Sequence, residues 1–227
     1  MGELSDRRAR KKAQTRDHIR RTAQALFAER GFEAVTIADV ATAADVAVQT
    51  VFNHFASKED LFFSERTPWV EGPAAAVRFR DDQTGPLAAL RAHLIELVDR
   101  YMQLAGTPEH RRLMRTLKSS PALRAHERLL HFEAEERVRR ALIDAWELRA
   151  GALDAFVPQN ARLSAGVVAA TWLGAIKALL IEQRRRPSSG NAADRAQMVH
   201  QAESVLDRCE RILIPADTEP VLTVRAS

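Results

Sequence analysis

Hydrophobic residues recur every three or four positions along most of the chain, which is the spacing of amphipathic helices. A stripe through Leu90, Leu94 and Val98 is one example. Prolines that follow small or polar residues mark fresh helix starts, because proline is favoured at the first helical position. Such breaks occur at 84–86, 107–108, 119–121 and 158–160. No segment alternates as a strand does, so the sequence predicts an all-α protein.

A shorter pattern stands near the N-terminus, at residues 36–58. Thr36 followed by Asp39 is typical of a capped helix start, and it predicts a helix over 37–43. A tight turn then leads to a second helix near 47–55, whose Val51 and Phe55 point inward. Two short helices joined in this way form a helix-turn-helix, whose second helix can enter a DNA major groove.

The outward face of the second helix carries side chains suited to reading bases. They are Val48, Gln49, Thr50 and Asn53. Gln49 or Asn53 can pair with adenine, and Val48 can contact a thymine methyl group. Phe52 is expected to pack against a sugar or against the protein's own core. His54 is expected on the backbone side of the groove, with a half-buried packing histidine as the alternative.

Phosphate contacts are expected from residues around this helix. Thr36 presents a hydroxyl at a helix start, and Lys58 begins the next helix. Eight basic residues against one acidic residue give residues 7–21 a charge of +7, and Arg16 lies among them. Such a segment can neutralise phosphates and release counterions. The alternative for residues 1–12 is a disordered, solvated tail without DNA contacts.

The run Val46-Ala-Val-Gln-Thr-Val-Phe-Asn-His-Phe-Ala-Ser-Lys-Glu-Asp-Leu61 resembles the TetR family of transcriptional regulators. Asp45, Ala47 and Phe52 depart from its usual glycine, serine and tyrosine. The resemblance implies an N-terminal three-helix DNA-binding domain followed by a larger helical ligand-binding and dimerisation domain. The expected divisions are a basic flexible arm (1–12), the helix-turn-helix domain (13–60), the helical body (61–214) and a loose tail (215–227).

Small residues recur every four positions in the predicted helix near 160–184, which would allow another helix to approach closely. In the TetR family this helix and the next pair with their twofold mates. We therefore expect a homodimer, with an intramolecular seam as the alternative. The expected interface residues are Leu163, Gly166, Val167, Ala170, Gly174, Ile181, Leu206 and Leu213.

A pocket for a small-molecule effector is implied by the resemblance more than by individual residues. Bulky side chains that could line it are Trp69, Tyr101, Met102, Met114, Trp146 and Trp172. Each of them could equally be plain core, the default use of an aromatic residue. Such a lining would favour a hydrophobic or amphipathic molecule.

Other classes of function find little support in the sequence. No motif of a hydrolase nucleophile or a phosphate-binding loop occurs, so no enzyme and no cofactor are expected. The histidines lack metal-ligand spacing, and no apolar run of about 18 residues suggests a membrane span. The charged N-terminus is not a secretory signal, and a cytoplasmic protein is expected.

These patterns predict a transcriptional regulator that binds a palindromic, double-stranded DNA operator as a homodimer. Repression, with release by the effector, is the expected mode. One alternative is a sequence-tolerant, architectural DNA-binding protein without an effector. Another is a helical ligand carrier or enzyme whose N-terminal motif is vestigial.

Overall fold

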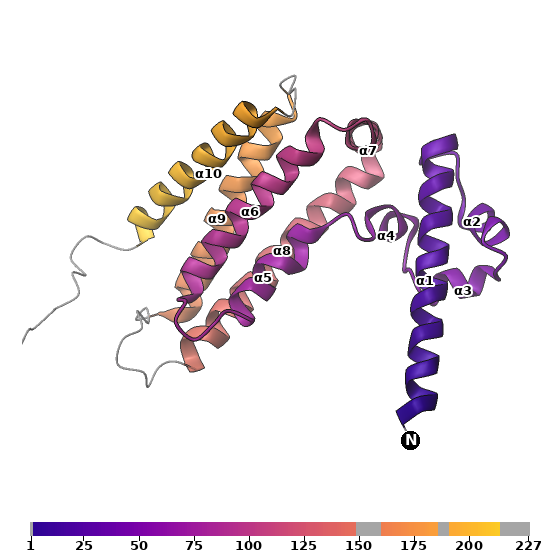
Figure 1. The fold of residues 1–227 in the computed structure, drawn as a ribbon, viewed down its shortest axis with the longest axis horizontal. Coiled ribbons are helices and arrows are strands. Elements are labelled where there is room, and N and C mark those ends of the chain that lie inside the picture. Colours follow the sequence, from indigo (N-terminus) through magenta and orange to yellow (C-terminus); the bar gives the residue numbers. More distant parts are fainter. Residues whose placement is uncertain (1, 149–159, 186–190, 214–227) are drawn as a thin grey trace, which may run out of the picture. The chain divides into compact units, whose positions relative to one another are not determined.

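The computed structural model describes residues 2–148, 160–185 and 191–213, and every regular element within them is a helix (Figure 1). This confirms the predicted all-α class. In chain order the helices are α1 (Gly2–Arg30), α2 (Ile37–Ala43), α3 (Val48–Phe52), α4 (Lys58–Phe63), α5 (Pro68–Arg78), α6 (Pro86–Ala105), α7 (Pro108–Ser119), α8 (Pro121–Leu148), α9 (Ala161–Gln183) and α10 (Ala192–Leu213).

The helix starts follow the predicted breaks. Helices α6, α7 and α8 begin at Pro86, Pro108 and Pro121, where the missing N–H of proline forfeits no helical hydrogen bond. Helix α9 begins after Asn160, whose side-chain oxygen accepts a hydrogen bond from Leu163 N at 3.0 Å. Local chemistry therefore sets most of the helix boundaries. The predicted tail at 215–227 lies outside the described residues.

The chain forms two compact units rather than dividing once near residue 60. The head unit comprises residues 1–68 and 108–130, and the body unit comprises residues 69–107 and 131–227. Helix α7 and the first turns of α8 belong to the head because Leu117 and Leu123 lie in one buried cluster with Phe62. Burial of these leucines corrects the predicted boundary, which followed chain order alone.

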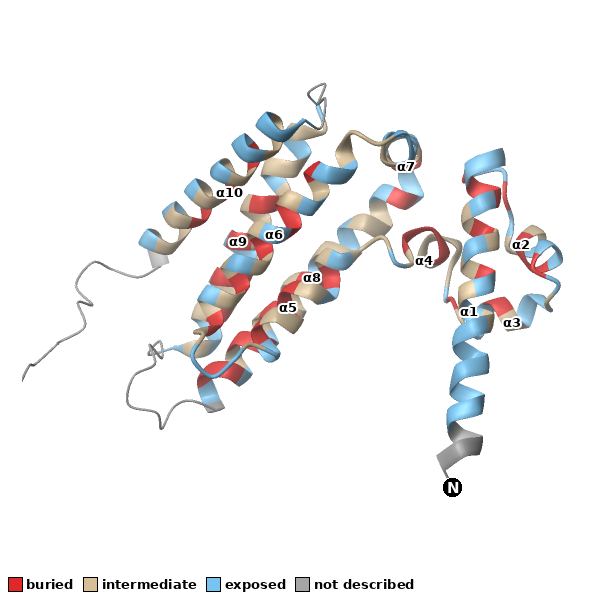
Figure 2. Ribbon diagram, viewed as in Figure 1, coloured by how far each residue is buried: buried red, intermediate tan, exposed pale blue. Residues whose placement is uncertain are grey.

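The expected flexible arm is instead part of a helix, since α1 already begins at Gly2. Residues 2–12 are rich in arginine and lysine, which favour helix, and contain no proline. Residues 6–14 are exposed, and Ile19 is the first fully buried side chain from residue 6 onward (Figure 2). The basic segment is thus a solvated helical extension of the head.

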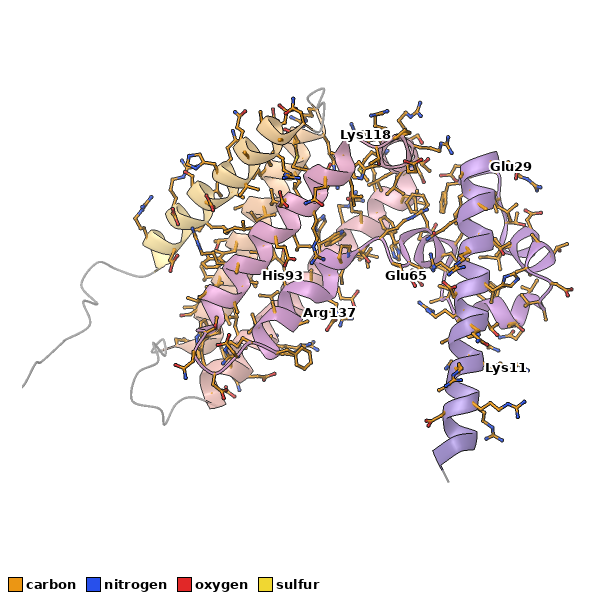
Figure 3. The ribbon with its side chains drawn as sticks, viewed as in Figure 1. Lys11, Glu29, Glu65, His93, Lys118 and Arg137 are labelled. Carbon is orange, nitrogen blue, oxygen red and sulfur yellow. The ribbon has the colours of Figure 1, made fainter. Side chains whose placement is uncertain are left out.

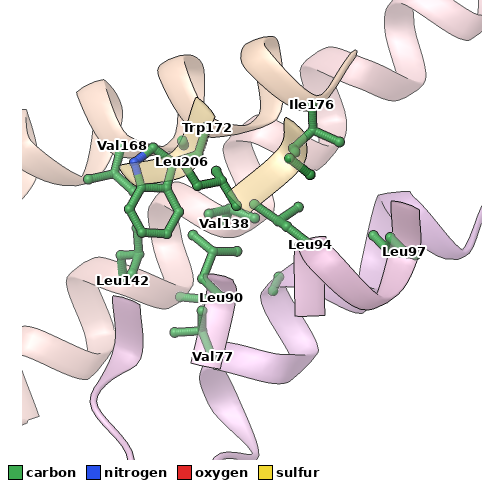
Figure 4. Close-up of a cluster of buried hydrophobic side chains, with 14 of the residues drawn as sticks. Val77, Leu90, Leu94, Leu97, Val138, Leu142, Val168, Trp172, Ile176 and Leu206 are labelled. Carbon is green, nitrogen blue, oxygen red and sulfur yellow. The ribbon is translucent and has the colours of Figure 1, made fainter. Parts of the chain in front are cut away.

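The body unit buries its largest apolar cluster among α5, α6, α8, α9 and α10. Trp172 of α9 lies against side chains from several of these helices (Figure 4). The labelled members of this cluster are Val77, Leu90, Leu94, Leu97, Val138, Leu142, Val168, Trp172, Ile176 and Leu206.

Candidate DNA-binding interface

The start of α2 is fixed by a reciprocal cap, as the sequence predicts. Thr36 Oγ1 accepts a hydrogen bond from Asp39 N at 3.1 Å, and Asp39 Oδ2 accepts one from Thr36 N at 2.7 Å. The Thr36 hydroxyl also donates to Asp39 Oδ2 at 2.6 Å. These hydrogen bonds lower the pKa of Asp39, which keeps the carboxylate ionised. The polar groups of Thr36 expected to meet phosphate are therefore engaged within the cap.

The turn between α2 and α3 requires a left-handed residue. Asp45 supplies it with a φ of 51°, a conformation that aspartate tolerates better than most residues. Ala47 then precedes α3 without any side-chain cap hydrogen bond. Helix α3 covers Val48–Phe52 and is shorter than the predicted 47–55, because His54 N bonds Val51 O at 3.0 Å in a tighter final turn.

The predicted base-reading side chains of α3 share an exposed face. Val48 and Phe52 are 42% and 48% exposed, although both are apolar. Gln49 and Asn53 are also exposed, and Gln49 Nε2 donates to Asn53 Oδ1 at 3.2 Å. Thr50 is half-buried at the edge of this face. The helix therefore offers two linked amides between two apolar side chains.

Cationic residues of α1 lie beside the end of α3. The Arg16 guanidinium donates to the carbonyl oxygen of His54 and lies over the Phe55 ring at 4.2 Å. Burial lowers the pKa of His54, and the positive charges of Lys12 and Arg16 lower it further. Lys12 and Arg16 are four residues apart, so they share one face of α1. A positive stripe thus runs along α1 to the end of the recognition helix.

Not every basic residue of this segment is available to DNA. Arg20 pairs with Asp17 and, at 3.1 Å, with Glu65, so it serves the packing of the head. Arg21 also pairs with Asp17, at 2.8 Å. Five further exposed cations lie earlier in α1, and Figure 3 shows Lys11 projecting from that part of the helix. They are Arg7, Arg8, Arg10, Lys11 and Lys12.

Lys58 occupies a different environment from the exposed one that a phosphate contact suggests. Its ammonium group donates to Phe32 O at 3.0 Å and Val35 O at 3.1 Å, and it lies 4.2 Å from the Phe32 ring centroid. Two of its three N–H donors are thus used to hold the loop between α1 and α2. The sequence pattern did not reveal this role, because Phe32 and Val35 are more than twenty residues away.

The candidate pocket residues lie in three environments. Met102, Trp146 and Trp172 are buried in the body core. Trp69 and Tyr101 are half-buried at its margin. Met114 packs on the buried cluster of the head unit instead, because α7 belongs to that unit. Met114 is therefore removed from a pocket in the body, whereas a lining role for the other residues stays a prediction.

The candidate dimer residues also divide. On α9, Leu163 is 64% exposed, and Ala170 and Ile181 are exposed as well. Val167 and Gly174 are half-buried, as is Gly166, where an added Cβ would lie 3.9 Å from Arg139 of the same chain.

Leu206 was wrongly assigned to the interface, because it is fully buried in the body core. Its helical stripe with Met198 and Ala202 faces α6 and α9 instead of solvent. The side chain of Leu213 lies outside the described residues.

Helix α9 is unusual in composition as well as in exposure. Among the residues that the structure describes, it is the one helix long and apolar enough to cross a membrane by length and composition alone. Only 28% of its apolar stretch is buried in the chain. A second copy of the chain is the cover that the sequence predicts for this exposed face.

Known proteins resemble the chain in its N-terminal part and in its fold. Residues 19–64 match the family model "Bacterial regulatory proteins, tetR family". The HTH-type transcriptional regulator TcmR of Streptomyces glaucescens is 32% identical over 139 residues, which cover 60% of this chain and 62% of TcmR. The regulator MftR of Mycobacterium tuberculosis is 30% identical over 117 residues, which cover 52% of this chain and 58% of MftR. The chain therefore spans less than two thirds of either relative.

A crystal structure of NalD, the secondary repressor of the MexAB-OprM multidrug efflux pump in Pseudomonas aeruginosa, shares the fold. Its TM-score is 0.52 at 22% identity, with 90% of this chain and 99% of NalD covered. The predicted helix-turn-helix and the matched family model coincide on the same helices. The matched residues, which include α2, α3 and α4, are thus similar to the N-terminal domain of the tetR family of bacterial regulatory proteins.

Proposed function

We propose that the protein is a transcriptional regulator that binds double-stranded operator DNA through α3 and the positive stripe of α1. The observation that carries this proposal is the exposed Gln49–Asn53 amide pair, which lies on a capped helix-turn-helix beside Lys12 and Arg16. Amides can read adenine, whereas the cations hold the backbone irrespective of sequence. The regulators TcmR and MftR support the same assignment.

A homodimer through α9 is the second part of the proposal. Leu163, Ala170 and Ile181 give the helix an exposed apolar face, which a twofold mate would cover. Two heads related by twofold symmetry would recognise two half-sites of a palindrome. Charge at this face, as in Leu163→Glu, should dissociate the dimer and weaken operator binding, which sedimentation at several protein concentrations would detect.

An effector in the body unit would act by favouring one conformation over another. Helix α8 is a route for such a change, because residues 131–148 belong to the body and residues 121–130 to the head. In the head, His126 of α8 stacks on Phe63 of α4 at 5.4 Å and lies 3.2 Å from Asp60. A shift of α8 would therefore displace α4. NalD is described as a repressor, and repression is the mode that we propose here.

The test is selection of binding sites from a random DNA library, followed by affinity measurements on the selected site at several salt concentrations. Gln49→Ala and Asn53→Ala should change the base preference at defined positions of each half-site. Lys12→Gln should weaken binding to all sequences and reduce the salt slope by about 1. Arg208→Gln, which removes an exposed cation from α10, is the matched control and should change neither property.

A single enriched palindrome would support the regulator. If the selection enriches no sequence and the salt slope is normal, the result would instead identify a sequence-tolerant architectural protein. An unchanged selection profile for both amide variants would reject α3 as the reading helix.

A further inference from the structure

Five half-buried residues of the body unit bring together positive charge and aromatic rings from four helices. They are Trp69, Tyr101, His131, Lys177 and Arg184, and we call them the cationic–aromatic cluster. His131 stacks on Trp69 with ring centroids 4.2 Å apart and an interplanar angle of 29°. The Arg184 guanidinium carbon lies 6.0 Å from the Tyr101 ring centroid. None of these contacts belongs to the proposed DNA interface.

The two cations lie on one edge of α9. Lys177 and Arg184 are seven residues apart, so both point to the same side of the helix. Gly166, three turns before Lys177, lies on this edge and faces Arg139 of α8. The edge therefore runs beside α8, the helix that carries His131.

Lys177 is the cation of the cluster whose charge has no acidic partner in the described part of the chain. Burial, and then the charges of Lys177 and Arg184, lower the pKa of His131 to about 4, and no acidic group contributes to this shift. Within residues 2–148, 160–185 and 191–213, no carboxylate forms an ion pair with Lys177.

Other half-buried cations of the body unit have carboxylate partners. Arg91 pairs with Asp207 at 2.6 Å, and Arg137 pairs with both Glu71 and Glu133. Arg137 belongs to α8 and is labelled in Figure 3. A half-buried lysine beside an uncharged imidazole lacks the partner that these arginines have, and an anion would supply it.

We propose that the cationic–aromatic cluster binds the anionic group of an aromatic small molecule. A carboxylate, sulfonate or phenolate oxygen would accept hydrogen bonds from Lys177 and Arg184, and its ring would pack on Trp69 and Tyr101. The binding site itself does not depend on the proposed function. Only the identification of the bound molecule as the effector rests on that function. The proposed site narrows the expected hydrophobic or amphipathic effector to an aromatic anion.

The test uses two fluorescent dyes that share their rings and differ in charge. One is 8-anilinonaphthalene-1-sulfonate, and the other is uncharged N-phenyl-1-naphthylamine. Both are titrated into the full chain without DNA, with Lys177→Gln and with Lys118→Gln, which removes an exposed lysine from α7 as a matched control. The wild type should prefer the sulfonate, and Lys177→Gln should weaken sulfonate binding about tenfold, the loss of one charge-assisted hydrogen bond.

The uncharged dye should bind the wild type and Lys177→Gln equally, which also shows that the variant is folded. Lys177→Met, which retains the apolar stem, should behave like Lys177→Gln. Displacement of the sulfonate dye by 1-naphthoate, but not by decanoate, would support the aromatic class.

Equal affinities for the two dyes, or a sulfonate affinity that Lys177→Gln leaves unchanged, would overturn the site. Displacement by decanoate as strong as that by 1-naphthoate would overturn its aromatic character. Because DNA is absent, a failure of the operator proposal leaves these titrations unaffected. If the protein binds its operator normally but has equal affinities for the two dyes, only the proposed cluster is refuted.

Discussion

The reading face of the head unit and the cationic–aromatic cluster of the body unit are assembled over very different distances along the chain. In the head, Thr36 bonds Asp39 and Gln49 bonds Asn53, partners three and four residues away. In the body, the cationic–aromatic cluster draws its members from positions 69 to 184. The reading face therefore depends on caps and turns, whereas the cluster depends on how whole helices pack. Damage to the body core should scatter the cluster while the caps of the head survive.

The largest effect is expected from Trp172→Ala in the body core. Trp172 is 1% exposed, and its removal leaves a cavity that should cost about 3–5 kcal/mol of the free energy of unfolding. Chemical denaturation followed by circular dichroism would measure this loss. The dye preference should disappear with it, because the packing that assembles the cluster is lost.

Trp172→Phe is the matched control. The indole Nε1 is buried and has no hydrogen-bond partner in the described part of the chain, so its loss breaks no bond. This variant should lose less than half as much stability as Trp172→Ala. Equal losses would contradict a cost that comes from the cavity.

Acid should weaken the body unit through His131. Its pKa is lowered from 6.5 to about 4 in the folded protein, so between these values the unfolded chain takes up a proton that the folded chain does not. The contribution of neutral His131 to the free energy of unfolding is fully present above pH 6.5. It is lost as the pH falls towards 4, which lowers the free energy of unfolding by at most about 3 kcal/mol.

NMR titration of the His131 ring would measure the pKa directly. Lys177→Gln should raise it, because one of the two neighbouring positive charges is removed. A pKa near 6.5 in the wild type would contradict the burial of the His131 ring and its closeness to Lys177 and Arg184.

Lys58→Met should damage the head by breaking a contact that spans more than twenty residues. Loss of two charge-assisted hydrogen bonds to Phe32 O and Val35 O should cost about 1.5–3 kcal/mol, seen as a lower melting temperature. Lys11→Met, which changes an exposed lysine of α1, is the control and should melt like the wild type. If Lys58→Met leaves the stability unchanged but weakens the affinity for every DNA sequence, the result would support the predicted contact of Lys58 with a phosphate.

The smallest expected effect is a gain in the stability of the head unit. Ala47→Ser would supply the side-chain cap that α3 lacks and should stabilise the head by about 0.5–2 kcal/mol. Thermal melting would detect it, with Ala56→Ser, at an exposed position outside the helix start, as the control. No gain from Ala47→Ser would show that packing of Val51 and Phe55 alone fixes the start of α3.

The sequence was sufficient for most helix starts and turns, although it missed that α1 extends to Gly2 and that α3 ends at Phe52. The α2 cap, the turn at Asp45 and the proline starts of α6, α7 and α8 were all predicted from short patterns. The exposed face of α3 followed from helical periodicity in the same way.

Signals that depend on distant partners were not available from one sequence. Leu206 reads as an interface residue by its spacing, but its environment is decided by α6 and α9. Lys58 matches a family position, yet two carbonyls of the preceding loop hold it. Lys177 carries no sequence signal of a site, because an isolated lysine on a helix is usually a solvated charge.

The hydrogen bond between Gln49 and Asn53 has a consequence for discrimination between DNA sites. The free protein already satisfies part of the bonding capacity of both amides, so a base must compete with an internal partner. A base edge that offers both a donor and an acceptor would replace the lost bond in full. A mismatched edge would separate the amides without replacing it. The amide pair would thus lower the affinity for mismatched sites more than it raises the affinity for the matched site.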